Sequence, residues 1–169
     1  MYMYIILHTD HFNLKNVFFS EREKNNVIQN CYFTHILYSD KNITLNNLVF
    51  QLNIPNMEFV EKTYRYHYIH NKVCVSIYKI NDCPWTQKLI EIESSILNLY
   101  NSVSQRYSIR YNLKHTLQKG MLHITGEEGN QILRISGVWQ DKMDNIGLIY
   151  KFITIHQPFA SINCDNSPT

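Results

Sequence analysis

The sequence predicts a mainly β fold with one main helix, arranged as a small antiparallel barrel. Runs of β-branched and aromatic residues alternate with turn sequences over most of the chain, and only residues 84–103 have a clear helical period. A single alanine, Ala160, against 12 tyrosines also favours strands over helices. With 169 residues, 44% of them hydrophobic, the chain is long enough to bury a core. We expect one domain at residues 1–156, followed by a polar and mobile tail at 157–169.

Strand-like runs fill the chain before the helix. They are separated by polar turn segments at 21–26, 39–42 and 70–71, and Pro55 ends another run. The segment 43–54 reads as a strand pair or as one bent strand. The expected strands are 2–9, 16–21, 27–39, 43–54, 58–69 and 72–80, the last two forming a hairpin.

The helix is predicted by its start and by its apolar spacing. Asp82 is a suitable N-cap, and Pro84 falls in the first turn, where its missing N–H costs nothing. An apolar stripe recurs at steps of three and four residues, formed by Leu89, Ile92, Ile96, Leu99 and Val103. We therefore expect a helix from about 84 to 103 that buries one face.

After the helix the strand period returns. Turns are expected at 126–130 and 141–145, because both segments are rich in glycine, asparagine or acidic residues. The expected strands are 106–117, 121–125, 131–139 and 146–155. A helix between strands of a small barrel is the arrangement of an OB-fold, so the prediction is an OB-like antiparallel β-barrel. An α+β open antiparallel sheet is the alternative.

Charge is distributed unevenly along a chain whose overall charge is close to neutral. The chain has 16 Lys and Arg against 14 Asp and Glu, but residues 62–119 hold nine basic and three acidic residues. Between Tyr100 and Thr125 there is no carboxylate at all. A one-sided distribution of this kind is typical of a surface that binds phosphate.

The segment 106–117 supplies the basic residues of a candidate site. If it is a strand, Arg106, Arg110 and Lys114 share one face, and cations at two-residue steps of about 7 Å could follow successive phosphates. Tyr107, Ile109, Tyr111 and Leu113 would then face the core. An ordinary solvated strand face explains the same pattern equally well.

A run of alternate tyrosines supplies candidate stacking groups. Tyr64, Tyr66 and Tyr68 share one strand face, and stacking of a base on an exposed ring contributes roughly 1–3 kcal/mol. The competing interpretation is the buried face of an ordinary strand. The expected nucleic-acid-binding residues are Tyr64, Arg65, Tyr66, Tyr68, Lys72, Trp85, Arg106, Arg110, Lys114 and Lys119.

The sequence argues against an enzyme. It contains no Gly-rich phosphate loop, no nucleophile elbow and no zinc-protease motif. Glu91 and Glu93 would diverge by about 200° on a helix, so they cannot form a catalytic carboxylate pair. The cysteines form no Cys-x-x-Cys pair. We expect no metal, no cofactor and no small-molecule substrate.

The N-terminus and the apolar runs bear on location. The first ten residues lack a basic region before the apolar stretch, and no run of 18 apolar residues exists. We therefore expect an intracellular protein that is neither secreted nor membrane-bound.

Two stretches resemble segments of single-stranded-DNA-binding proteins of large, AT-rich DNA viruses. One is 85–100 with the basic strand after it, and the other is 132–139 with the return strand 147–152. The 19 asparagines fit an AT-rich genome. The resemblance implies an OB-fold and sequence-tolerant single-stranded nucleic-acid binding, most simply of DNA in replication or recombination, in the host nucleus or cytoplasm. The alternative is a viral interaction or structural subunit, in the form of a homo-oligomer, that binds no nucleic acid.

Overall fold

The computed structural model describes residues 4–26, 28–52, 57–66, 72–80, 83–102, 106–126, 129–156 and 159–161. The protein is mainly β, as predicted. The helical elements are the 3-10 turns η1 (Thr9–His11) and η2 (Leu14–Asn16) and the helices α1 (Pro84–Ser102) and α2 (Asn112–Gln118). No helix in the described part of the chain has the length and apolar character needed to cross a bilayer.

Most strands lie within the predicted runs, but Glu23–Lys24 form a short strand in the expected turn 21–26, and the expected strand 2–9 is only three residues long and is followed by η1. A further difference, at 106–117, is described below. Before α1 they are β1 (Tyr4–Ile6), β2 (Val17–Phe19), β3 (Glu23–Lys24), β4 (Tyr32–Ser39), β5 (Thr44–Leu45), β6 (Leu48–Gln51), β7 (Met57–Tyr66) and β8 (Lys72–Ile80). After α1 they are β9 (Ser108–Ile109), β10 (Met121–Thr125), β11 (Asn130–Gln140), β12 (Asn145–Ile155) and β13 (Phe159–Ser161). The expected turn at 70–71 and the residues Pro55, Asp82 and Val103 lie outside the described ranges.

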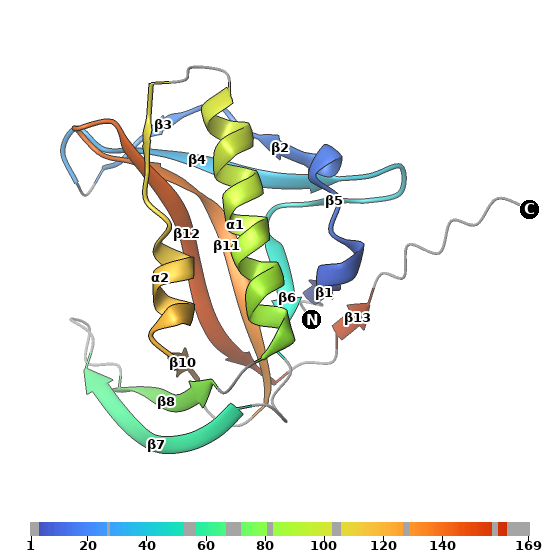
Figure 1. The fold of residues 1–169 in the computed structure, drawn as a ribbon, viewed down its shortest axis with the longest axis vertical. Helices are drawn as coiled ribbons and strands as arrows, with labels where there is room; N and C mark the ends of the chain where they lie inside the picture. The colour runs from blue at the N-terminus through green and yellow to red at the C-terminus, as the bar shows by residue number, and fades with distance from the viewer. Residues whose placement is uncertain are drawn as a thin grey trace, which may run out of the picture.

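The main sheet is open and mixed, which corrects the prediction of a closed antiparallel barrel. Its strands follow the order β2-β4-β11-β12-β10-β8-β7, and its two ends, β2 and β7, do not pair with each other. Most neighbours are antiparallel, but β12 pairs in parallel with both β9 and β10. The β10–β12 pairing is limited to Thr125 and Ile153, and beyond this point the sheet turns away toward β7 (Figure 1). The alternative of an open sheet was therefore closer, although that sheet is not purely antiparallel.

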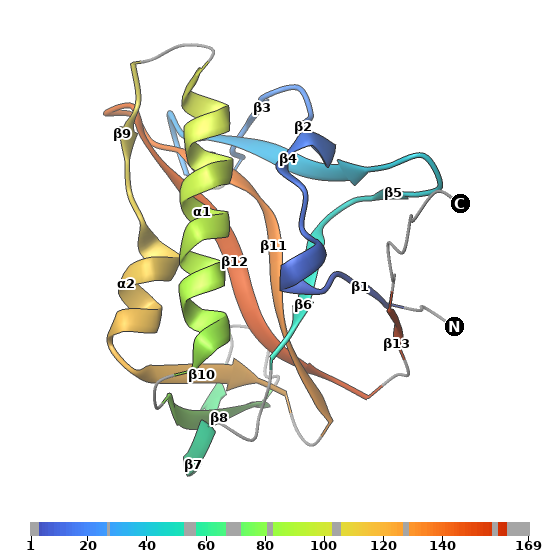
Figure 2. The same ribbon diagram turned by 45° about the vertical axis from the view of Figure 1, so that its right-hand side comes forward.

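Helix α1 lies across one face of the sheet, in front of β11 and β12 in both views (Figures 1 and 2). The predicted apolar stripe is confirmed, because Leu89, Ile92 and Ile96 are buried in the main core. Across from them, Leu133 and Leu148 on β11 and β12 are also buried. Burial of this apolar area is the main source of the stability of the fold.

Residues 106–117 do not form the long strand that their alternation predicted. Only Ser108 and Ile109 pair with a neighbouring strand, and α2 begins at Asn112. Leu113 and Leu117, one helical turn apart, are both buried, and this burial favours the helix over the strand. Lys114 therefore lies on a helix, and the expected row of cations on one strand face does not exist.

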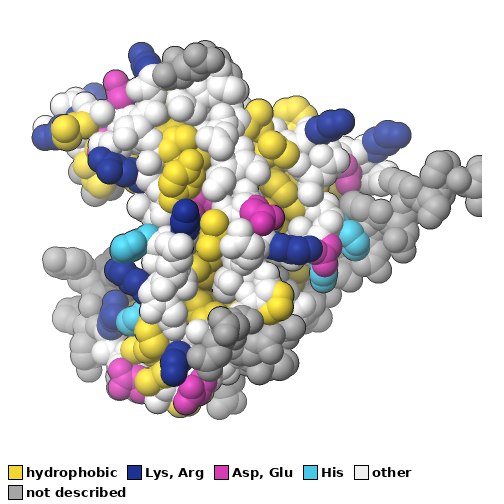
Figure 3. All heavy atoms as spheres, in the orientation of Figure 1, with side chains coloured by type: hydrophobic (Ala, Val, Ile, Leu, Met, Phe, Trp, Pro, Cys, Tyr) yellow, Lys and Arg dark blue, Asp and Glu magenta, His cyan; other side chains and the backbone are white. Residues whose placement is uncertain are grey.

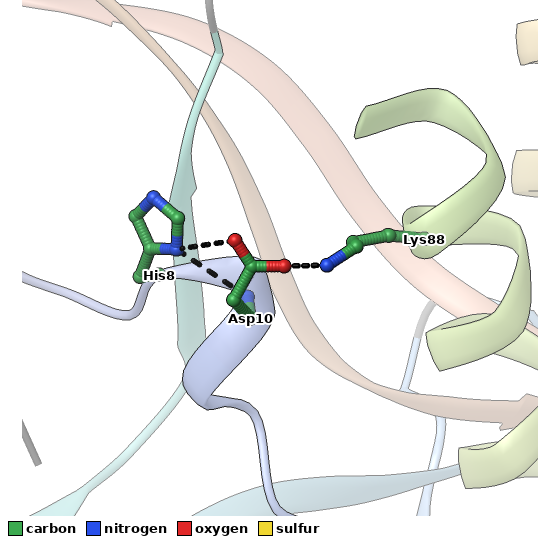
Figure 4. A network of polar contacts seen from close by, with 3 residues as sticks. All are labelled: His8, Asp10 and Lys88. Carbon is green, nitrogen blue, oxygen red and sulfur yellow. Dashed lines mark hydrogen bonds and ion pairs between the residues drawn. The ribbon is translucent and has the colours of Figure 1, made fainter. Parts of the chain in front are cut away.

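The 3-10 turn η1 is joined to α1 by a polar contact. Asp10 lies between two basic side chains: Lys88 Nζ contacts one carboxylate oxygen, and His8 Nδ1 lies 3.3 Å from the other (Figure 4). The Asp10 and Lys88 side chains are about half exposed, so their pair contributes at most about 1 kcal/mol. Lys88 is thus directed toward the N-terminal segment.

The expected tail contains one ordered element. Strand β13 pairs in parallel with β1, placing Phe159 opposite Tyr4 and Ser161 opposite Ile6. Residues 162–169 lie outside the described ranges, so the mobility of the tail stays a prediction.

Candidate nucleic-acid interface

Basic side chains gather along one side of the molecule, over β9, α2 and β10 (Figure 3). We call this surface the cationic edge. Its members come from the chain segment 106–123 and from β7. They are Arg106, Arg110, Lys114, His115, Lys119, His123 and Arg65, and all are exposed except Lys114, which is half-buried.

A buried carboxylate positions the helix that carries the centre of this edge. Glu93 on α1 is fully buried, and its two oxygens accept hydrogen bonds from the backbone N–H groups of Leu113 (2.9 Å) and Lys114 (2.7 Å). These N–H groups belong to the first turn of α2 and have no partner within that helix. Burial raises the pKa of Glu93, while the two hydrogen bonds and the charge of Lys114 oppose the rise. Glu93 therefore fixes α2 against α1.

Arg106 begins the cationic edge and lies against an aromatic pair. Its guanidinium lies 5.0 Å from the centre of the Tyr107 ring and donates a hydrogen bond of 3.2 Å to the Tyr107 hydroxyl. The Tyr107 ring stacks on Tyr100, with 5.9 Å between centroids. The hydrogen bond to Tyr107 and the carboxylate of Asp144 raise the pKa of Arg106, which stays charged at every working pH.

Arg110 is oriented by the turn between β11 and β12. Its Nε donates a hydrogen bond of 3.1 Å to the side-chain oxygen of Asn145. Asn145 in turn donates from its side chain to Asp141, and this bond lowers the pKa of the Asp141 carboxyl. Asp141 and Asp144 reduce the positive charge at this end of the edge.

Helix α2 continues the edge. Lys114 Nζ lies 6.0 Å from the centre of the Tyr111 ring, and His115 and Lys119 are exposed one turn apart on one helix face. The buried side of the helix is fixed by Tyr150, whose hydroxyl contacts the hydroxyl of Thr116 at 2.8 Å. Burial raises the pKa of Tyr150, so its hydroxyl is a stable hydrogen-bonding group at neutral pH.

Strands β10 and β7 contribute the last two members. Arg65 lies within hydrogen-bonding distance of His123, at 3.4 Å from Nη2 to Nδ1. The strand register puts both side chains on one sheet face, because Thr63 and Thr125 both oppose Val75 and therefore share its face. Arg65 and His123 are each two residues from one of these threonines, so they lie on the same face.

Tyr64, the first tyrosine of the expected run, does not lie on the sheet face of Arg65. Tyr64 is 49% exposed, but strand alternation puts it on the opposite face of β7. Tyr66 and Lys72 face each other at the ends of β7 and β8, and their side chains lie outside the described part of the structure, as does Tyr68 entirely. Of the expected residues, Arg65, Arg106, Arg110, Lys114 and Lys119 thus belong to the cationic edge, with Arg106 and Arg65 at its two ends.

Trp85 belongs to the core rather than to the cationic edge. It lies in the first turn of α1, partly buried against the main core, and its ring Nε1 atom is enclosed. The aromatic rings that accompany the cations are instead Tyr107 and Tyr111, which are half-buried beside Arg106 and Lys114.

Sequence reasoning missed four members of the site: Tyr107, Tyr111, His115 and His123. The expectation that the two tyrosines face the core is confirmed in part, because both are half-buried against the main core, although no long strand carries them. The sequence also contains two signals of a helix at 112–118: Leu113 and Leu117 are four residues apart, and Gly120 is a typical residue after a helix end. Gly120 has φ of +70°, as that position requires.

The described residues contain no group of three or more His, Cys, Asp or Glu side chains that could hold a metal ion. A polar hollow of about 420 Å³ lies at the turn before β4, lined by Lys24, Asn25, Asn26, Gln29 and Asn30, and none of these residues belongs to the cationic edge. Comparison with protein-family models, with curated proteins and with solved structures finds no match for this chain.

Proposed function

We propose that the protein binds single-stranded nucleic acid, without strong sequence preference, along the cationic edge. The observation that supports this most directly is that Arg106, Arg110, Lys114 and Lys119 flank or lie on two successive elements, β9 and α2, and that all but the half-buried Lys114 are exposed. Residues 101–125 include no carboxylate that could neutralise them from within the same segment. Phosphate is the ligand that a group of exposed cations on one surface favours.

The basic side chains differ in how firmly they are held, so we expect them to contribute to binding in different ways. Arg106 and Arg110 are held by hydrogen bonds to Tyr107 and Asn145, so their guanidinium groups are partly oriented before a phosphate arrives. Lys114 and Lys119 provide less constrained charges on α2. Arg65 extends the row across His123 onto β7. The protein would act as a binding module and not as an enzyme.

Half-buried aromatic rings among the cations favour a single strand over a duplex. Tyr111 lies beside Lys114, and an unpaired base could stack on the exposed part of such a ring while a paired base could not reach it. The Tyr107 ring already contacts Tyr100 and Arg106, so a base would have to displace Arg106 to stack there. The proposal depends on this edge and not on an OB-fold, because the sheet is open. The ligand that we propose is single-stranded DNA in replication or recombination, as the sequence resemblance implied.

The test is the affinity of the full chain for labelled oligo-dT and for a duplex of equal length, measured by fluorescence anisotropy. If the strand contacts about four cations, the affinity for oligo-dT should fall about fiftyfold between roughly 50 mM and 200 mM salt. The duplex should bind more weakly at both salt concentrations. Equal affinity for the duplex, or an affinity that does not change with salt, would refute the proposal.

A further inference from the structure

The outer edge of β7 is a second exposed surface, distinct in kind from the cationic edge. β7 is the last strand of the main sheet and pairs only with β8 among the described strands. Its residues from Glu58 to Lys62 are exposed, and Phe59 and Val60 expose 55% and 48% of their surface. A long edge strand with exposed apolar side chains is a template for pairing with another strand.

The sequence of β7 is complementary to itself in one antiparallel register. Consider two copies of the strand that pair in antiparallel fashion about a two-fold axis perpendicular to the sheet. The residue on the axis then lies opposite the same residue of the second copy, and each residue before it lies opposite the residue at the same distance after it in the second copy. With Thr63 on the axis, Glu61 faces Arg65 of the second copy, and Lys62 faces Tyr64. We propose that a second copy of this chain docks on β7 in this register, forming one sheet through the dimer.

The other registers of the regular segment 61–65 are less favourable. An axis at Glu61, Lys62 or Arg65 places two like charges directly opposite each other, which is destabilising. An axis at Tyr64 places Arg65 opposite Thr63 and forms no ion pair. Only the axis at Thr63 puts a neutral pair at the centre and an oppositely charged pair on each side, because symmetry repeats the contact between Glu61 and Arg65.

Neighbouring side chains are compatible with this dimer. Glu61 forms no ion pair with any described residue, so its carboxylate is available to a partner. The bulge between Phe59 and Glu61 interrupts the ladder with β8, which resumes at Phe59, and the exposed side chains of Phe59 and Val60 lie directly beside the segment 61–65. A partner strand would cover part of this apolar surface and contribute affinity beyond the ion pairs.

Charge exchange between Glu61 and Arg65 tests the register. In Glu61→Arg, two arginines would face each other at each contact, and in Arg65→Glu two glutamates would. Each single variant should raise the dissociation constant of the dimer about thirtyfold, measured by sedimentation velocity. The double variant Glu61→Arg/Arg65→Glu should restore the wild-type dissociation constant. An equimolar mixture of the two single variants should form a heterodimer, because each contact then joins opposite charges.

The control is Lys41→Glu, which changes an exposed charge in the turn between β4 and β5 and should leave the dimer unchanged. Circular dichroism of each variant verifies that the fold is retained. A wild-type protein that stays monomeric at all concentrations would overturn the proposal, and so would single variants that dimerise normally or a mixture that does not associate. The readout is mass, so this result is independent of nucleic-acid binding, although Arg65 belongs to both surfaces.

Discussion

Replacing Glu93 with alanine is expected to lower the free energy of unfolding by about 2–4 kcal/mol. The carboxylate accepts two backbone hydrogen bonds at the start of α2, and its side chain is fully buried between α1 and α2. The substitution leaves the N–H groups of Leu113 and Lys114 without their acceptor and opens a cavity. Urea unfolding followed by circular dichroism gives the free energy directly.

The matched control for this prediction is Glu91→Ala. Glu91 lies on the same helix, two residues away, but is exposed and accepts a single hydrogen bond from Gln87. Its replacement should change the free energy of unfolding by about 0.5 kcal/mol or less. Equal losses from the two variants would show that Glu93 does not position α2.

The pH dependence of stability should distinguish Glu93 from an ordinary glutamate. Burial raises its pKa in the folded state above the ordinary value of 4.5, so the folded protein holds this proton more tightly than the unfolded chain does. The stability from this difference is fully present below pH 4.5 and is lost as the pH rises through the raised pKa. The free energy of unfolding of the wild type relative to Glu93→Gln should therefore fall as the pH rises from 4.5, and a difference that is constant or rises would contradict the assignment.

Gly137→Ala should be comparably damaging, with an expected loss of about 3 kcal/mol. Gly137 lies on β11 at an irregularity in its pairing with β12, where β4 approaches closely from the other side. A Cβ atom there would lie 2.3 Å from the carbonyl oxygen of Thr34 and 2.5 Å from the ring of Phe33. Because the oxygen belongs to the backbone, the two strands would have to separate.

The control Gly120→Ala measures the cost of replacing a glycine where the added Cβ atom meets no steric clash. Gly120 has φ of +70°, but a Cβ atom added there would lie no closer than 3.8 Å to its nearest neighbour, the carbonyl oxygen of Ile80. The expected loss at this position is about 1 kcal/mol, which is the cost of the left-handed conformation for alanine. Thermal unfolding of both variants compares the two costs, and a smaller loss for Gly137→Ala than for Gly120→Ala would rule out the clash.

Much of the fold could be predicted because its signals are local. The stripe Leu89, Ile92 and Ile96 predicted the position and buried face of α1, and alternation with turn residues predicted strands β10, β11 and β12 within a residue or two. Glu91 and Glu93 diverge on the helix as expected, since the first is exposed and the second is buried.

The remaining features depend on contacts between distant segments. The strand period from Tyr107 to Leu113 competes with the helical spacing of Leu113 and Leu117, and the helix is favoured because Glu93, twenty positions earlier, supplies acceptors at its start. Closure of the sheet likewise depends on its end strands, β2 and β7, which do not meet. No local pattern predicts whether these two end strands meet.

The candidate site was predicted by charge and not by geometry. The absence of carboxylates between Tyr100 and Thr125 pointed to the segment that forms most of the cationic edge. The positions of its cations changed, because a helix and a short strand replace the expected long strand. Tyr64 was expected beside the cations but lies across the sheet from Arg65, since neighbouring residues of a strand face opposite sides.

The most direct test of the cationic edge is the salt dependence of oligo-dT binding by the variant Arg106→Gln/Lys119→Gln. Both side chains are exposed, so the fold should be retained. If each contacts one phosphate, the slope of log affinity against log salt should become shallower by about 1.4. The control Lys15→Gln/Lys41→Gln removes two exposed charges outside the edge and should keep the wild-type slope. An unchanged slope in the first variant, or an equal loss in both, would contradict binding along the cationic edge.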